Sequence, residues 1–362
     1  MKIGILTFFH ANNYGAVLQA FSLQKKLESL GYQAECIDYR CLAIERRHRK
    51  LPLNLSMGIS KLVKNVIRNY YFHRREKGFT LFRDTIPHSI PFNIESISKT
   101  NDNYDVFITG SDQVFNLNLT DNDETFFLPF VRNDKMKVAY AASMGKYLED
   151  KENRYKELLT SFKMLSVREK TAASQIRENL LIDCLVMPDP VFLYSGDEWK
   201  NLLGIDNDSD SKPYLLIYSL YGDALLFEAA NKVANDLKVK IVLITKMMKI
   251  RGKYDKLIRN ADPIEFIKLF TNARYVLTDS FHGTCFSIIL NKDFNVVLPP
   301  HASERILDIL EELKLKDRIV NEYTDAGGTI KYDEESITNL RNRGIDFLKN
   351  IRDLKGNVTQ TK

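Results

Sequence analysis

The chain has 362 residues, of which 44% are hydrophobic and 27% are charged. This composition excludes a wholly disordered chain, and at about 150 residues per domain the length predicts two domains. The 52 basic and 47 acidic residues leave a net charge of +5, which does not by itself indicate a nucleic-acid-binding protein. No run approaches the roughly 18 apolar residues of a spanning helix, and the four cysteines form no metal-binding or disulfide pattern. We therefore expect a cytoplasmic protein with no metal site and no nucleic-acid partner.

Short β-branched runs alternate with longer helical patterns in the first half of the chain. Residues 2–7 predict a strand, and residues 14–30 predict a helix that ends at Gly31. Residues 33–38 predict a second strand, so this segment is expected to form a right-handed parallel βαβ unit. Further strands are expected at 105–109, 137–142, 164–168 and 182–186, and helices at 150–163 and 169–180.

The alternation breaks between about 40 and 100, where we expect a helical insertion in the first domain. Apolar side chains at helical spacing make one face, and Lys61, Lys64 and Arg68 lie on the other. Two interpretations of the basic region 40–77 stay open: a solvated charged face, which we favour, and a peripheral contact with anionic lipid. The apolar positions are Ile59, Leu62, Val63, Val66, Ile67 and Tyr70, and further basic residues are Arg46, Arg47, Arg49, Lys50, Arg74, Arg75 and Lys77.

A polar stretch at about 194–213 predicts the boundary between the two domains, because its composition is typical of a linker. We expect an N-terminal domain at 1–195, a C-terminal domain at 196–330 and a helical segment at 331–362 that packs back. The fold class is α/β, with two Rossmann-like domains facing a cleft, similar to the GT-B glycosyltransferase architecture. In the second domain, strands are expected at 214–219, 240–245, 274–278 and 294–298, and helices at 223–237, 263–271, 283–291 and 303–314.

Polar residues follow two strands of the first domain, where parallel sheets place their ligand sites. Asn12, Asn13 and Tyr14 come after the first strand, and the amides of the next helix can hold an anion or a sugar hydroxyl; the alternative is ordinary turn chemistry. The second group combines a glycine, which admits a ligand close to the backbone, with side chains that suit sugar hydroxyls. Its alternative is that a serine or aspartate caps a helix. This group is Gly110, Ser111, Asp112 and Gln113.

Arg168 stands at the junction between a strand and a helix. An arginine there can make a forked, charge-assisted contact with a carboxylate or phosphate. The alternative is a surface pair with Glu169, worth under about 1 kcal/mol. The nearby run 187–190, which contains Asp189 between two prolines, is interpreted as a turn near the domain boundary rather than as a ligand contact.

The most informative group follows a strand of the second domain. Ser280 can cap the next helix and leave its amides for a ligand, beside Gly283 and Thr284. His282 falls in the first turn of that helix, where a bound dianion would favour the protonated imidazole and make it a proton donor. Arg305 can reach the same cleft. The alternatives are a structural histidine and an exposed arginine.

Taken together and in order, six segments resemble the polysaccharide pyruvyl transferase family over roughly residues 3–315. Phe115 departs from the pattern, since many members have tryptophan there, and its loss of an indole N–H bears on the acceptor contact. The segments are ILTFFHANNYGAVLQAFSLQ (5–24), GSDQVF (110–115), YAASMG (140–145), SVREK (166–170), DPVFL (189–193) and TDSFHGTCFSIILNK (278–292).

The resemblance implies transfer of a pyruvyl group from phosphoenolpyruvate to a sugar, which forms a cyclic ketal and needs no cofactor. The acceptor would be a sugar of a bacterial-type surface polysaccharide or its precursor, free or carried on a lipid, with the enzyme in the cytoplasm or at the inner face of the membrane. The family's catalytic histidine would fall on His282, and its donor-binding arginines on Arg168 and Arg305.

Two other functions stay open at this point. A glycosyltransferase that uses a nucleotide-sugar donor would share the fold and the anion-binding helix ends. A non-catalytic carbohydrate-binding protein would bind sugar without releasing phosphate. Thermal-shift titration with phosphoenolpyruvate and with nucleotide sugars distinguishes the two enzymes, because a ligand stabilises the folded state that binds it.

Overall fold

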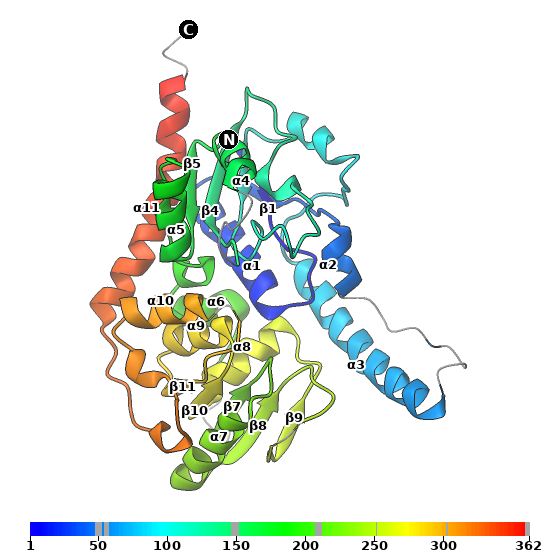
Figure 1. Ribbon diagram of the computed structural model, residues 1–362, viewed down its shortest axis with the longest axis vertical. Helices are drawn as coiled ribbons and strands as arrows, with labels where there is room; N and C mark the ends of the chain where they lie inside the picture. Colours follow the sequence, from blue (N-terminus) through cyan, green and yellow to red (C-terminus); the bar gives the residue numbers. More distant parts are fainter. Residues whose placement is uncertain are drawn as a thin grey trace. The chain divides into compact units, whose positions relative to one another are not determined.

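The computed structural model describes residues 1–47, 53, 58–145, 152–206, 212–250, 252–301 and 303–358, with side chains as far as Asp353. Arg49, Lys50 and much of the polar stretch at 206–213 lie outside these residues. The chain divides into two compact units, which Figure 1 shows in the colours of the sequence. Unit 1 comprises Met1–His48, Arg83–Leu193 and Glu334–Lys362, and unit 2 comprises Arg49–Phe82 and Tyr194–Asp333.

Unit 1 is built on a sheet of six strands in the order β2-β1-β3-β4-β5-β6, and every neighbouring pair is parallel. In β1, Ile3 lies opposite Ala34 of β2 on one side and Val106 of β3 on the other. β3 and β4 are buried at every position, as expected when helices cover both faces of a parallel sheet. The strands are β1 (Lys2–Leu6), β2 (Gln33–Cys36), β3 (Val106–Thr109), β4 (Met136–Ala142), β5 (Met164–Val167) and β6 (Leu185–Val186).

The helices of unit 1 begin and end at residues that suit those positions. Asn13 caps the first helix through its side chain, and Gly31 follows the C-cap with a φ of +80°, a conformation that glycine adopts without strain. The helices are α1 (Tyr14–Ser29), α2 (Leu42–Arg47), α4 (Glu152–Leu159), α5 (Lys170–Asn179) and α11 (Glu334–Val358), with short 3₁₀ helices η2 (Ile97–Asp102), η3 (Thr125–Phe127) and η4 (Pro190–Leu193).

The C-terminal helix α11 packs on unit 1. The Tyr32 hydroxyl donates to the Leu348 carbonyl across 3.1 Å. At Gly344 the backbone approaches Tyr140 so closely that a Cβ would lie 2.4 Å from the tyrosine oxygen, which requires glycine there. The ring of Phe347 lies 5.6 Å from that of Tyr140.

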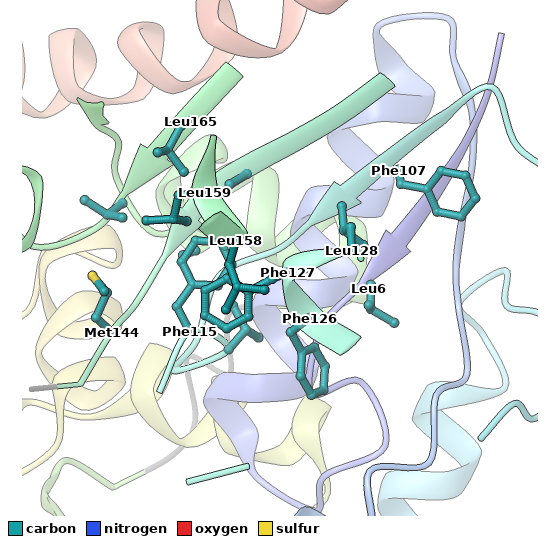
Figure 2. Packing of buried hydrophobic residues seen from close by; sticks show 14 of the residues in the cluster. Leu6, Phe107, Phe115, Phe126, Phe127, Leu128, Met144, Leu158, Leu159 and Leu165 are labelled. Carbon is teal, nitrogen blue, oxygen red and sulfur yellow. The ribbon is translucent and has the colours of Figure 1, made fainter. Parts of the chain in front are cut away.

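The core of unit 1 is rich in aromatic rings, and Figure 2 shows part of it. Phe115 stacks on Phe127 with ring centroids 4.4 Å apart and planes 13° apart. Phe126, which follows Thr125 in η3, meets Phe8 edge to face at 5.0 Å. Such pairs stabilise a core by about 0.5–1.5 kcal/mol beyond the burial of their area.

Unit 2 has a second sheet, of five strands in the order β11-β10-β7-β8-β9, again parallel throughout. β9 has three residues and was not expected from the sequence. The strands are β7 (Tyr214–Tyr218), β8 (Lys240–Ile244), β9 (Lys256–Ile258), β10 (Tyr275–Thr278) and β11 (Phe294–Val296). Both sheets thus have the Rossmann-like character that the sequence predicts.

The helices of unit 2 include one that falls inside the stretch interpreted as a linker. Ser195 and Glu198 form a capping box, in which each side chain accepts from the other's backbone N–H. The helices are α3 (Ile59–Arg83, whose last residue belongs to unit 1), α6 (Gly196–Leu203), α7 (Ala224–Leu237), α8 (Pro263–Asn272), α9 (Phe281–Ile289) and α10 (Glu304–Glu312), with 3₁₀ helices η5 (Lys316–Arg318) and η6 (Tyr323–Asp325).

Part of the helical insertion differs from the expectation in its place. α3 continues to Arg83, and the segment up to Phe82 groups with unit 2 rather than with the first domain. Close packing explains this: a Cβ on Gly78 would lie 2.8 Å from that of Asp262, and the Arg259 guanidinium lies 5.6 Å from the Tyr71 ring. Among the described residues, no helix is both long and apolar enough to cross a bilayer.

Candidate functional site

The two sheets each have a point where the strand order reverses, between β1 and β3 in unit 1 and between β7 and β10 in unit 2. Ligands of open parallel sheets bind beyond the carboxyl ends of strands at such points. The segments 10–14 and 110–113 follow β1 and β3, and the segment 279–284 follows β10. The sequence motifs therefore lie at the topological switch point of each unit.

In the segment after β1, the three residues that the sequence selected as ligand-binding candidates contact other parts of the fold. Asn13 accepts from the Gly15 amide at 2.9 Å, and Asn12 accepts from an Arg83 amino group at 2.8 Å. Tyr14 is buried in the core. The alternative of ordinary turn and capping chemistry accounts for Asn13 and Tyr14.

His10, in the same segment, lies among charged groups. Arg40 can only donate, so the 2.6 Å contact of its Nη1 makes His10 Nε2 the acceptor. Nδ1 lies 3.6 Å from the Asp38 carboxylate. Burial, with the nearby Arg40 and Arg83 charges, lowers the pKa of His10 to about 4. His10 is therefore a neutral acceptor at neutral pH. Arg40 and Arg83 could not be linked to His10 from the sequence, because they lie far from His10 along the chain.

Arg168 is buried in a polar network that links the ends of three strands. Its Nη1 lies 2.5 Å from Asp189 Oδ2 and 3.3 Å from the Ser111 hydroxyl, which itself donates to the same carboxylate oxygen at 2.9 Å. Burial opposes the charge, but the carboxylates of Asp189 and Glu169 outweigh it and raise the pKa of Arg168. The surface-pair interpretation of Arg168 and Glu169 is wrong, since their side chains are 4% and 9% exposed.

The network continues through Glu169 to the segment after β3. The Ser143 hydroxyl donates to Glu169 at 2.5 Å, and the Ser143 amide donates to the Asp112 carbonyl at 2.9 Å. Asp112 has a φ of +79°, and its carboxylate accepts from the Gln113 amide at 2.9 Å. The backbone at Gly110 lies close to Thr7, because a Cβ added to this glycine would lie 3.2 Å from the Thr7 Cβ. Residues 111–124 contain no helix, so the capping alternative for Ser111 and Asp112 is wrong.

Asp189 is the residue of this network that the sequence analysis passed over. Its second oxygen accepts from the Val191 amide at 3.1 Å, while the first holds Arg168 and Ser111. The sequence signal for Asp189 was its position between two prolines and before the apolar run 191–193, which indicates that it is buried. A buried carboxylate requires a cation or hydrogen-bond donors nearby.

In unit 2, Asp279 fixes the loop that follows β7. Its carboxylate accepts from the Ser219 hydroxyl and the Leu220 amide, both at 2.7 Å, and from the amides of Tyr221 at 3.1 Å and Gly222 at 3.3 Å. Burial raises the pKa of Asp279 in spite of these hydrogen bonds. The carboxylate thus joins the two strands on either side of the switch point.

Ser280 caps α9, as expected, and accepts from the Gly283 amide at 3.4 Å. Gly283 itself has a packing role, because a Cβ there would lie 2.3 Å from the Thr278 hydroxyl. Thr284 is fully buried and donates back to the Ser280 carbonyl at 3.1 Å. These two residues set the first turn of α9 against β10.

His282 and Arg305 both contact the ring of Phe281. The imidazole centroid lies 5.1 Å from that ring, edge to face, and the Arg305 guanidinium lies 5.4 Å from the ring centroid. His282 is 8% exposed, in the first turn of α9, and Arg305 is half-buried in the first turn of α10. The structure therefore brings together the imidazole and one of the two arginines that the sequence selected.

The expectation that Phe115 bears on a contact with the acceptor is wrong, because Phe115 is not a surface residue. Its ring is fully buried between Phe127 and Phe162 in the core of unit 1. Among the described residues, no group of three or more His, Cys, Asp or Glu side chains is arranged to hold a metal ion. All four cysteines are buried, and none of them forms a disulfide; they are Cys36, Cys41, Cys184 and Cys285.

Comparison with known proteins shows the fold. The UDP-GlcNAc 2-epimerase of Methanocaldococcus jannaschii, solved with UDP-GlcNAc and UDP, is similar with a TM-score of 0.53 and 14% identity over 98% of this chain and 99% of that one. The epimerase of Neisseria meningitidis gives 0.49 and 8% over 100% of both chains. The glycosyltransferase SnogD of Streptomyces nogalater gives 0.41 and 10% over 96% and 94%.

No curated protein matches the sequence. A family model does, and the model described as polysaccharide pyruvyl transferase matches residues 13–299. This range begins at Asn13, within the segment after β1, and contains the Ser111 loop, Arg168 and the first turn of α9, while Arg305 lies beyond it. The chain belongs to the polysaccharide pyruvyl transferase family.

Proposed function

We propose that this protein transfers a pyruvyl group from phosphoenolpyruvate to two hydroxyls of one sugar, which forms a pyruvate ketal and releases phosphate. The observation that carries the proposal is His282 in the first turn of α9, beside Arg305 and at the switch point of the unit 2 sheet. Membership of the family supports it. The reaction requires no cofactor beyond the donor.

The proposed reaction starts with protonation of the donor's methylene carbon by His282. The proton converts the methylene to a methyl group and leaves carbon 2 electron-poor. One sugar hydroxyl then adds to carbon 2 and returns a proton to His282, and phosphate leaves with the C–O bonding pair. The second hydroxyl closes the ring, and its proton passes to the released phosphate. A positioned acid typically contributes about 10²–10⁴ in rate.

The surroundings of His282 suit a donor that carries both a phosphate and a carboxylate. The N-terminus of α9 is the positive end of a helix dipole, and Arg305 supplies a fixed cation that can make a forked contact with an anion. A bound dianion next to the imidazole favours its protonated form. We therefore assign donor binding to Arg305 and to the start of α9.

For Arg168 we propose a positioning role. Asp189 and Glu169 already balance its charge, and both lie on the same unit as the loop 110–113. A donor carboxylate would have to share the guanidinium with these two partners. The ordered loop then offers Asp112 and Gln113, which are half-buried, to the sugar hydroxyls.

The test measures phosphate release from phosphoenolpyruvate with a panel of galactosides and N-acetylhexosamines, and product mass by mass spectrometry. We expect His282→Ala to lower turnover at least 10²-fold with an unchanged circular dichroism spectrum. His73→Ala removes an imidazole that is 69% exposed, and it serves as the matched control with normal turnover. Near-normal turnover of His282→Ala would remove His282 from the acid role.

The alternative donor is a nucleotide sugar, which the structurally similar epimerase of M. jannaschii binds in its crystals. Thermal-shift titration distinguishes the two donors, since 100 times the Kd of ligand adds about 2.7 kcal/mol of stability. We expect stabilisation by phosphoenolpyruvate and none by UDP or GDP sugars. The reverse result would replace pyruvyl transfer with glycosyl transfer, and sugar binding without phosphate release would indicate a binding protein.

A further inference from the structure

The helix α3 carries an apolar stripe that faces solvent. Ile59 is 83% exposed, and the four other members are between 43% and 55% exposed. Their spacings of four, three, one and three residues place them on one face of the helix. A stripe of this length on a folded domain normally packs on something, because isolated exposed apolar residues are common but contiguous ones are not. The stripe consists of Ile59, Val63, Val66, Ile67 and Tyr70.

The stripe is not the face by which α3 packs on its own unit. Gly78 lies against Asp262 and Tyr71 lies under the Arg259 guanidinium, and both residues are on another side of the helix from the stripe. Within the first three turns, Asn65 is the buried residue and the stripe lies on the other side of the helix. Unit 2 therefore leaves open the apolar face that the sequence pattern identifies.

The charge of α3 is strongly one-sided. The helix sequence contains seven Lys and Arg residues and a single acid, Glu76, so its formal charge is 7 − 1 = +6. Arg74 and Lys77 continue the line of the stripe, and the Arg74 guanidinium donates to the Tyr70 hydroxyl at 3.1 Å. Lys61 and Lys64 are exposed on the opposite, polar face of the helix. An apolar stripe within a cationic helix is typical of helices that lie at the surface of an anionic bilayer.

We propose that α3 binds the surface of a membrane that contains anionic phospholipid, with the stripe at the boundary of the acyl chains and the lysines and arginines at the headgroups. The helix lies in the plane of the interface and does not span the bilayer, in line with its composition. A second copy of the chain is a poorer occupant, because pairing two helices of charge +6 brings like charges together. The inference is independent of the reaction proposed above.

The experiment is co-sedimentation of the full chain with vesicles of phosphatidylcholine, with and without phosphatidylglycerol. We expect binding only when phosphatidylglycerol is present, and weaker binding at high salt because the attraction is screened. Val63→Glu/Ile67→Glu should lower binding about tenfold or more. Ile90→Glu/Ile94→Glu is the matched control, since it places two charges four residues apart at exposed isoleucines of unit 1.

A second pair of variants isolates the role of charge. Arg74→Glu/Lys77→Glu should also lower binding about tenfold or more, because each cation near an anionic surface contributes favourably. Lys99→Glu/Lys163→Glu makes the same change in net charge at exposed lysines of unit 1 and should bind as the wild type does. Circular dichroism and donor-dependent phosphate release with a soluble acceptor, measured on all variants, check that each is folded.

Three results would overturn the proposal. The first is equal binding to vesicles with and without phosphatidylglycerol, or to neither. The second is unchanged binding of both α3 variants. The third is a dimer in sedimentation velocity that Val63→Glu/Ile67→Glu converts to a monomer while the wild type leaves vesicles unbound, which would make a second copy the occupant. None of these results bears on pyruvyl transfer.

Discussion

The polar residues at the two switch points are held in contrasting ways. In unit 1, Arg168 is 4% exposed and lies between the carboxylates of Asp189 and Glu169, so its charge is balanced within the fold. In unit 2, Arg305 is half-buried and lies over the ring of Phe281, which also contacts His282. In unit 1 a charge balanced within the fold orders a loop, whereas in unit 2 a cation and an imidazole lie against one ring at the starts of two helices. We therefore propose loop positioning for the unit 1 site and proton transfer for the unit 2 site.

The largest effect on stability is expected at Asp189. Asp189→Ala leaves the Arg168 guanidinium buried without its main partner, and breaking a buried pair in this way typically costs about 3–5 kcal/mol. Urea unfolding followed by circular dichroism measures the change. Asp197→Ala removes an exposed aspartate from a pair with Lys200, and it should leave the unfolding midpoint unchanged. If the two variants had equal unfolding midpoints, the buried Arg168–Asp189 pair would not contribute to the stability of unit 1.

The same pair tests the division of roles directly. Arg168→Met/Asp189→Leu replaces both charges by apolar groups, which typically restores stability that the single variant loses. If Arg168 only positions the loop, kcat falls while the KM for phosphoenolpyruvate stays within about threefold. A KM raised by about tenfold or more, in a variant as stable as the wild type, would instead place Arg168 at the donor.

A smaller effect is expected at Phe115, where many family members are expected to have tryptophan. The ring is fully buried and stacks on Phe127 at 4.4 Å, so Phe115→Trp inserts extra volume into a filled core. Overpacking of this kind typically costs about 1–3 kcal/mol, which urea unfolding resolves. The Michaelis constant for the sugar should not change. A tighter sugar interaction with no loss of stability would show that this position contacts the acceptor after all.

A pH dependence of stability is expected from His10, which has no effect near neutral pH. Its pKa is lowered from 6.5 to about 4 by burial and by Arg40 and Arg83, so between these values the unfolded chain binds a proton that the folded chain does not. Stability therefore falls as the pH drops from 6.5 toward 4 and is fully present above 6.5. Unfolding midpoints across this range should show a shallower slope in His10→Asn than in the wild type. His73→Asn, at an exposed imidazole, should keep the wild-type slope.

The sequence could predict the elements whose signals are local. Periodicity and helix-end signals predicted β1, α1 with its end at Gly31, and α9 with its Ser280 cap, whereas the capping role of Asn13 was not predicted. The strand β9 was not predicted, because three residues are too few to show a period. The helix α6 was not predicted, because its capping box lies in a polar stretch that was interpreted as a linker. The side of α3 that packs could not be known, since the helix is amphipathic in sequence but its partner is set by tertiary contacts.

For the candidate site, the sequence identified positions better than it identified environments. His282 and Arg305 were selected and do lie against one ring. Arg168 was selected as an anion-binding group, but its partner Asp189 is 21 residues away and Ser111 is 57 residues away, joined only through the sheet. Contacts of that kind follow from strand order, which a linear pattern does not contain.

The place of α11 has a consequence for how the protein is made. The helix completes unit 1, yet it is encoded after all of unit 2. During synthesis the ribosome releases the six strands of the first sheet long before the helix that covers Tyr140 and Leu193. Until α11 emerges, the nascent chain exposes this apolar patch, so unit 1 matures only after unit 2 has been translated. A shortened chain that stops before 334 would keep the second sheet intact and leave the first one prone to aggregate.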